Sequence, residues 1–239
     1  WLLWQMGPAN TAYHLGAALR LQGSLHLPSL QRALNGVVER HEALRTAFRA
    51  DAYGNSRQYL GQPYNVPLEH LDLSNMEIGL RDAEVERVLA EYYRQPFDLQ
   101  QGILVRAVSI VLAPGQHVLA IVMHHIAGDA WSKGVVVAEF AALYNAALDG
   151  SPGDLLPPHL QYMDYALWEA DWLTSSDWQR QRDFWRGHLA GFEPALNLPF
   201  RHTDRSHQDH APTVCHLDMS SALTEALVAL ARTQQTGIF

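Results

Sequence analysis

Residues 116–132, QHVLAIVMHHIAGDAWS, constrain the fold of this 239-residue chain more than any other stretch. Val118 to Met123 is a continuous apolar run that contains β-branched residues, and its length predicts a strand buried on both faces. His124 and His125 stand at the end of this strand, and a short polar loop follows them. Because ligands of open α/β sheets bind beside the carboxyl ends of strands, these histidines are candidate site residues.

Strand geometry separates the two histidines. Successive strand side chains point to opposite faces, so we expect one of His124 and His125 to face a cleft and the other to pack inside. This argues against a shared metal site, and the sequence holds neither an H-E-x-x-H motif nor paired cysteines. We therefore predict no metal. From spacing alone, two purely structural histidines remain an equal alternative.

Strands and helices alternate along the rest of the chain. A Pro114-Gly115 turn between two apolar runs predicts an antiparallel hairpin, and Ser132 is the expected N-cap of the helix that follows the histidines. Expected strands cover residues 13–21, 58–60, 66–71, 103–112, 116–123 and 213–217, and expected helices cover 28–48, 76–94, 132–148, 160–190 and 220–234.

The expected helix at 28–48 carries an arginine in an unusual place. Helical spacing puts Arg45 close to the middle of the apolar face and Arg40 toward its edge. A buried arginine is costly unless it is paired, so the pattern predicts a buried carboxylate beside Arg45. The alternative is a side chain that extends to the surface.

Composition bounds the function. The net charge of −8 argues against nucleic acid or an anionic membrane as the main partner. No apolar run reaches the roughly 20 residues that span a bilayer, and the opening lacks the features of a signal peptide. The single Cys215 excludes a disulfide framework and is compatible with the cytoplasm. We expect the tryptophans of residues 160–190 to pack in the core or between helices. The residues at the two ends of the sequence predict that it is a piece of a longer protein.

Several segments together resemble the condensation domains of nonribosomal peptide synthetases. The segment MHHIAGDAWS, Met123 to Ser132, resembles the family's His-His-x-x-x-Asp-Gly motif, and RHEALRTAF, Arg40 to Phe48, resembles a second motif. Three further segments match the family in order: YMDYALWEADWL, PFDLQQGILVRA and AYHLGAALRLQGSL. The resemblance covers essentially the whole chain. One departure is Ala130, which stands where the family motif has glycine; it is harmless if φ there is negative.

The resemblance implies an α/β fold like that of chloramphenicol acetyltransferase, with a mixed β-sheet flanked by helices. It divides the chain into an N-terminal lobe at residues 1–196, a connector at 197–212 and the beginning of the C-terminal lobe at 213–239. The later family motifs are absent, which predicts that this piece alone is inactive if the second lobe is missing.

The resemblance also implies an acyltransferase reaction in secondary metabolite biosynthesis. A donor acyl or peptidyl thioester would react with the amine of an acceptor aminoacyl thioester to form a peptide bond, with an L-configured donor and acceptor. His125 would be a general base or a positioning group, since imidazole titrates near neutrality, and His124 would be structural. Asp129 would pair with Arg45, or alternatively with Arg40. Gly128, Ala130, Trp131 and Ser132 complete the motif, whose amides are candidate oxyanion donors.

Partners follow from the same resemblance. Donor and acceptor peptidyl carrier proteins would bring phosphopantetheine arms, so the domain itself needs no bound cofactor, and an adenylation domain would be its neighbour in one chain. Two alternatives stay open. One is a coenzyme A-dependent acyltransferase of the same fold, and the other is an inactive half-domain that only folds or docks carrier proteins.

Overall fold

A four-stranded mixed sheet is the centre of the fold. In the computed structural model, which describes residues 1–8, 10–151, 153–192 and 217–238, the strand order is β1-β6-β5-β4. The strands are β1 (His14–Gln22), β4 (Leu68–Asp72), β5 (Val105–Ala113) and β6 (Gln116–His124). β6 is antiparallel to both β1 and β5, whereas β4 is parallel to β5. This confirms the predicted hairpin and the mixed α/β sheet.

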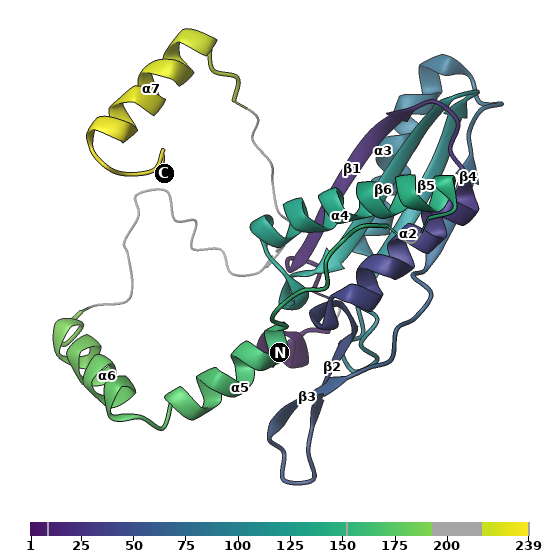
Figure 1. The fold of residues 1–239 in the computed structure, drawn as a ribbon. Coiled ribbons are helices and arrows are strands. Elements are labelled where there is room, and N and C mark those ends of the chain that lie inside the picture. The colour runs from purple at the N-terminus through teal and green to yellow at the C-terminus, as the bar shows by residue number, and fades with distance from the viewer. Residues whose placement is uncertain (9, 152, 193–216, 239) are drawn as a thin grey trace, which may run out of the picture. The chain divides into compact units, whose positions relative to one another are not determined.

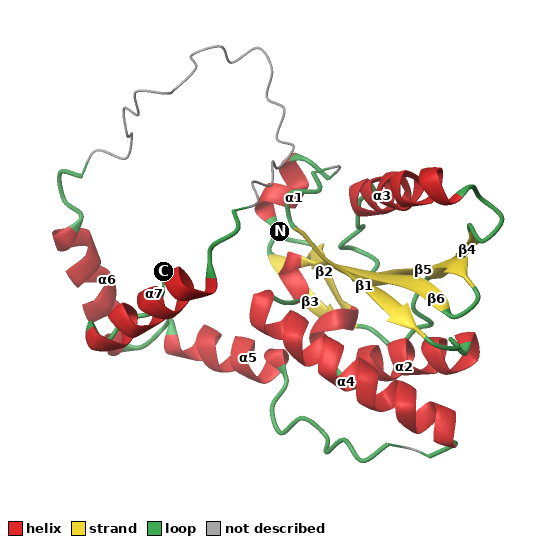
Figure 2. Ribbon diagram, turned by 90° about the horizontal axis from the view of Figure 1, so that it is seen from above, coloured by secondary structure: helices red, strands yellow, loops and turns green. Residues whose placement is uncertain are grey.

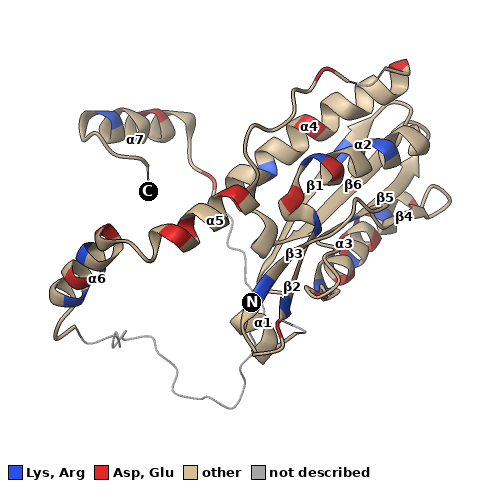
Figure 3. Ribbon diagram, turned by 60° about the horizontal axis from the view of Figure 1, so that its bottom comes forward, with Lys and Arg blue, Asp and Glu red and all other residues tan. Residues whose placement is uncertain are grey.

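Helices cover both faces of this sheet (Figures 1 and 2). Figure 2 shows α2 (Leu27–Arg40) and α4 (Ala130–Asp149) on one face and α3 (Ile78–Arg94) on the other. Alternate residues of β6 supply the two cores: Leu119, Ile121 and Met123 pack with α2 and α4, and Val118, Ala120 and Val122 pack with α3. Because both faces are covered, the strand reads as a continuous apolar run. Figure 3 shows charged residues along α3 and α6 and few on these strands.

The predicted helix at residues 28–48 is correct only as far as Arg40. His41 takes an extended conformation, with φ −108° and ψ 104°, and so ends α2. A 3₁₀ turn, η1 (Glu42–Arg45), follows, and residues 46–48, the last part of the predicted helix, lie in a strand. That strand, β2 (Thr46–Ala50), pairs with β3 (Ser56–Leu60) in a separate two-stranded antiparallel ribbon. Local spacing could not show this pairing, because β3 supplies the partner from outside the segment.

The remaining helices of the first unit are α1 (Leu2–Met6), α5 (Tyr162–Trp172) and α6 (Ser176–His188). Neither α5 nor α6 contributes a buried residue. Trp168 and Trp185 are more than half exposed, so the expected core position of these two is wrong. Trp172 and Trp178 do pack between the helices, with ring centroids 5.5 Å apart.

The chain clusters into two units, Trp1–Asn197 and Leu198–Phe239. The second contains α7 (Ser221–Thr233), which confirms the predicted helix; the Ser220 hydroxyl accepts from the Leu223 N–H at its start. The predicted connector at 197–212 and nearly all of the predicted strand at 213–217 lie outside the described residues. The predicted lobe boundary stays a prediction.

Candidate functional site

His124 is the last residue of β6, and its side chain is buried beside His14 and Phe97. The N–H of Ile126 donates to its Nδ1 atom at 3.0 Å, which requires that nitrogen to be unprotonated. Burial, with a smaller contribution from nearby His14, lowers the pKa of His124 from 6.5 to about 4. His124 is therefore a neutral structural histidine that turns the chain out of the strand.

His125 has the opposite environment. It is exposed and begins a 3₁₀ turn, η2 (His125–Ala127), and its backbone N–H donates to the Tyr13 carbonyl at 2.7 Å. His125 is one of the residues that line a pocket at this end of the sheet. Strand alternation predicted different environments for the two histidines, and the structure buries His124 and exposes His125 although the strand ends between them.

Asp129 begins the helix that follows the histidines. Its Oδ1 atom accepts from both the backbone N–H and the hydroxyl of Ser132, each at 2.9 Å, and these bonds lower the pKa of the carboxyl. Asp129 is thus the N-cap of α4, and the expectation that Ser132 caps this helix is wrong. Gly128 has extended backbone, with φ 177°, but a Cβ there would lie 2.9 Å from the Ser132 Cβ. Gly128 is required for space and not for its backbone angle.

Ala130, the departure from the family motif, is the first residue of α4 and is exposed. Among the described residues the only non-glycine with positive φ is Gln235, so φ at Ala130 is negative. The backbone at this position tolerates a Cβ. The next residue, Trp131, also lines the pocket, and 83% of this residue is exposed.

Neither predicted ion pair of Asp129 is formed in the described part of the chain, which contains all the residues concerned. Because α2 ends at Arg40, helical spacing does not place Arg45. The Arg45 guanidinium is largely buried, but its Nη1 atom donates to the Gly61 carbonyl at 2.6 Å and its Nη2 atom lies 4.0 Å from Glu42. Arg40, the alternative partner, pairs with Glu139. The buried arginine was predictable, and its partner was not.

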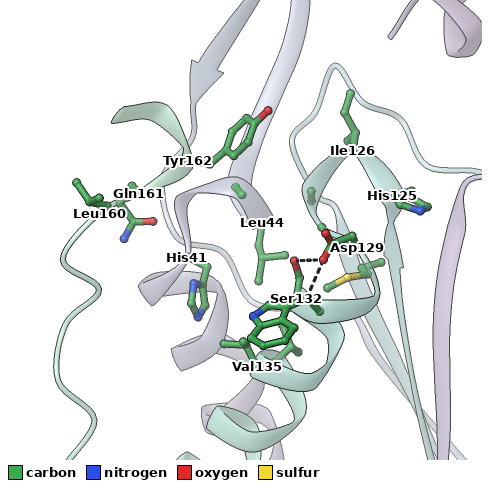
Figure 4. A pocket seen from close by; sticks show the side chains of 16 residues that line it. His41, Leu44, His125, Ile126, Asp129, Ser132, Val135, Leu160, Gln161 and Tyr162 are labelled. Carbon is green, nitrogen blue, oxygen red and sulfur yellow. Dashed lines mark hydrogen bonds between the residues drawn. The ribbon is translucent and has the colours of Figure 1, made fainter. Parts of the chain in front are cut away.

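The pocket has a volume of about 460 Å³ and two walls (Figure 4). One, here called the motif wall, consists of the pocket residues between Met123 and Val136. The other contains the end of a segment without regular secondary structure, residues 155–161, here called the strap. Figure 4 shows Asp129 and Ser132 between His41 on one side and His125 on the other. The lining residues opposite the motif wall are His41, Ala43, Leu44, Leu160, Gln161 and Tyr162.

Sequence reasoning missed three residues around this pocket: His41, Glu139 and Gln161. His41 falls on the apolar face of the expected helix at 28–48, and that position gives it no functional signal. Glu139 had a signal, because it is the only carboxylate in α4 before the final residue. Gln161 also had one, since it stands three residues before Asp164 in a capping box at the start of α5. Neither signal indicates a pocket.

No group of three or more His, Cys, Asp or Glu side chains in the described residues is placed to hold a metal ion. None of the helices described is both long and apolar enough to cross a membrane.

Comparisons with known proteins identify the class. The family model of the condensation domain matches residues 1–238. Over its full length the chain is 36% identical to chondramide synthase cmdD of Chondromyces crocatus, and over its full length it is 32% identical to malpinin synthetase of Mortierella alpina. It spans 6% and 3% of these relatives.

Solved structures agree. The first condensation domain of the calcium-dependent antibiotic synthetase, in complex with a substrate analogue, matches with a TM-score of 0.79 and 26% identity, over 100% of this chain and 55% of that one. The X-domain from teicoplanin biosynthesis matches with a TM-score of 0.81 and 30% identity, over 97% and 50%. These matches therefore define a domain with the chloramphenicol acetyltransferase-like fold. More particularly, the chain belongs to the condensation-domain family of nonribosomal peptide synthetases, and it spans about half the length of these solved relatives.

Proposed function

We propose that this chain supplies the histidine-bearing half of a peptide-bond-forming condensation domain. The observation that carries the proposal is the division of the two histidines: His124 is buried and held neutral, whereas His125 is exposed at the edge of a pocket beside the N-terminus of a 20-residue helix. An exposed imidazole at a pocket can exchange protons with a substrate, and a buried one cannot do so without a path.

The proposed reaction joins two thioesters. The amine of an acceptor aminoacyl thioester attacks the carbonyl carbon of the donor acyl or peptidyl thioester, so that a C–N bond forms and the C–S bond breaks. His125 accepts the proton that the ammonium nitrogen loses and returns it to the departing sulfur, which leaves as a free thiol. In the weaker form of the proposal, His125 only hydrogen-bonds to the amine and positions it.

Asp129 has a structural role in this proposal. Its carboxylate is occupied by the N–H and hydroxyl of Ser132, which fixes the turn between His125 and α4. The helix N-terminus then faces the pocket side, where its partial positive charge favours a developing oxyanion. The finer parts of the proposal are an L-configured donor and acceptor, phosphopantetheine arms on two carrier proteins, an adjacent adenylation domain and a cytoplasmic location. They rest on the family membership.

A half-domain that only folds or docks carrier proteins is the second candidate, because the chain spans about half of the solved condensation domains it matches. The test is a condensation assay on the purified protein with donor-loaded and acceptor-loaded carrier proteins. Product above background supports the enzyme. Absence of product supports the docking half-domain. Product from a small acyl-coenzyme A in place of the donor carrier supports the related acyltransferase.

His125→Ala tests the site itself. We expect the condensation rate to fall by about 10²- to 10⁴-fold if His125 transfers the proton. The matched control is His70→Ala, which removes an exposed histidine on β4, away from the pocket, and should leave the rate unchanged. Unchanged turnover in His125→Ala would contradict the proposed role.

A further inference from the structure

The strap (residues 155–161) reaches the pocket but is not held in place by packing in the core. It has no helical or strand hydrogen bonds of its own, and Leu156 and Leu160 are 79% and 78% exposed. The helix that follows it, α5, contributes no buried residue. Since so little apolar surface is buried here, other contacts must fix the position of this wall.

Those contacts are polar, and they converge on two residues at or just beyond the end of α2, Arg40 and Glu42. Arg40 donates from Nη2 to the Leu156 carbonyl at 2.7 Å and from Nη1 to the Leu155 carbonyl at 3.3 Å. At the pocket end of the strap, the Gln161 amide donates to the Arg40 carbonyl at 2.8 Å and accepts from the Glu42 N–H at 3.1 Å. Both ends of the strap are therefore fastened to the end of α2.

The Arg40 guanidinium is in turn oriented by Glu139 of α4. Its Nε atom lies 3.1 Å from Glu139 Oε2, and its Nη2 atom lies 3.3 Å from Oε1, a bidentate arrangement. Both side chains are only 17% exposed. His41, which lines the pocket, also contacts Glu139 Oε2 through Nε2 at 2.7 Å. One carboxylate thus holds the cation that fastens the strap and a histidine of the pocket.

The position of Glu139 along α4 connects it to both walls of the pocket. Asp129 caps the start of α4 and fixes the motif wall, and Glu139 lies on the same helix. Helix α4 is therefore attached to both walls of the pocket, through Asp129 at one and through Glu139, Arg40 and Gln161 at the other. A change in Glu139 would alter the spacing of the walls without a contact to the reacting groups.

We propose that Glu139 is a positioning residue of this site: through Arg40 and His41 it sets the distance between the strap and the motif wall. This distance determines how well an acyl or aminoacyl substrate is held. This inference rests on the proposed function for its kinetic consequence. Its structural consequence stands without any activity.

The structural test is amide hydrogen exchange on the complete protein and its Glu139→Ala variant. We expect about tenfold faster exchange at the amides of Glu42, Asp164 and Tyr165, whose partners are Gln161 atoms, because removal of the carboxylate frees Arg40 and the strap. Exchange in residues 118–123 of β6 should stay the same. The control is Glu39→Gln, an exposed carboxylate on α2 that forms no ion pair within the described residues.

The kinetic test uses the same variants with carrier-bound substrates. We expect Glu139→Ala to raise KM by about threefold to tenfold while kcat changes less than twofold. Glu139→Gln, whose amide oxygen can still accept from Arg40, should recover part of the loss, and Glu39→Gln should match the parent. Unchanged exchange at Glu42, Asp164 and Tyr165 would overturn the positioning role, as would a fall in kcat with constant KM. An inactive parent would count against the proposed function alone, because the exchange measurement still decides the role of Glu139.

Discussion

The two walls of the pocket are held by different kinds of interaction. The motif wall continues directly from β6, whose residues 118–123 are buried between two helical layers. The strap instead lies at the surface and depends on hydrogen bonds to backbone carbonyls around one arginine. The comparison teaches that one side of this site is as stable as the core, while the other is fixed by a few polar contacts that can open locally.

Leu119→Ala and Leu160→Ala test this difference most directly. Leu119 is fully buried in β6, so its truncation should lower the free energy of unfolding by about 2–5 kcal/mol. Leu160, in the strap, is 78% exposed, and the same truncation should change it by less than about 0.5 kcal/mol. Urea unfolding of both variants measures this. Equal losses would remove the distinction between the walls.

The pH dependence of stability should come partly from His124, which is buried at the end of β6, beside the motif wall. Its pKa is about 4 in the folded protein and 6.5 when exposed, so the unfolded chain binds a proton first as the pH falls. The free energy of unfolding should therefore be highest above pH 6.5, decrease by roughly 2–3 kcal/mol down to pH 4, and then level off with respect to this group. Urea unfolding at pH 7 and 4.5 should show a smaller decrease for His124→Asn. An identical decrease in variant and parent would contradict this.

Gly128→Ala tests close packing within the motif wall. The added methyl would lie 2.9 Å from the Ser132 Cβ, so the variant should lose about 1–3 kcal/mol of stability. Because the backbone at Gly128 is extended, no φ strain contributes. Combining the change with Ser132→Gly should make Gly128→Ala much less costly than in the parent. A double-mutant cycle in thermal unfolding measures that coupling, and strict additivity would show the steric explanation to be wrong.

Ala130→Gly is expected to have the smallest effect. It restores the glycine of the family motif at an exposed first helical residue, so stability should fall by no more than about 0.5–1 kcal/mol, through the greater freedom of glycine in the unfolded chain. The condensation rate should stay within about twofold of the parent. A large increase in rate would mean that this position needs glycine for contacts beyond the described residues.

The sheet and the motif wall could be predicted from the sequence because their signals are local. The apolar run 118–123 and the Pro114-Gly115 turn determine a buried hairpin, and a histidine pair at its end must divide between two environments. The cap was ambiguous, since Asp129 and Ser132 are both good N-cap residues, and their mutual hydrogen bond decides which begins the helix. Family resemblance named the motif but not its contacts.

The strap side could not be predicted because its contacts join distant residues. Gln161 bonds to Glu42 across 119 positions, and Arg40 reaches Leu156 across 116. The sequence indicated correctly that Arg45 would be buried. However, the extended conformation of His41 ends the helix before Arg45, so helical spacing does not describe where Arg45 lies. As a result the predicted partner, Asp129, was replaced by the Gly61 carbonyl and Glu42.

The pairing of β1 with β6 has a consequence for synthesis on the ribosome. Gln22 pairs with Gln116 and His14 with His124, so the first strand of the sheet waits for a partner that is made about 100 residues later. At 5–20 residues per second this delay lasts about 5–20 s, during which the apolar strand has no partner. The nascent chain therefore exposes an aggregation-prone edge throughout this interval, and we expect chaperones to bind it there.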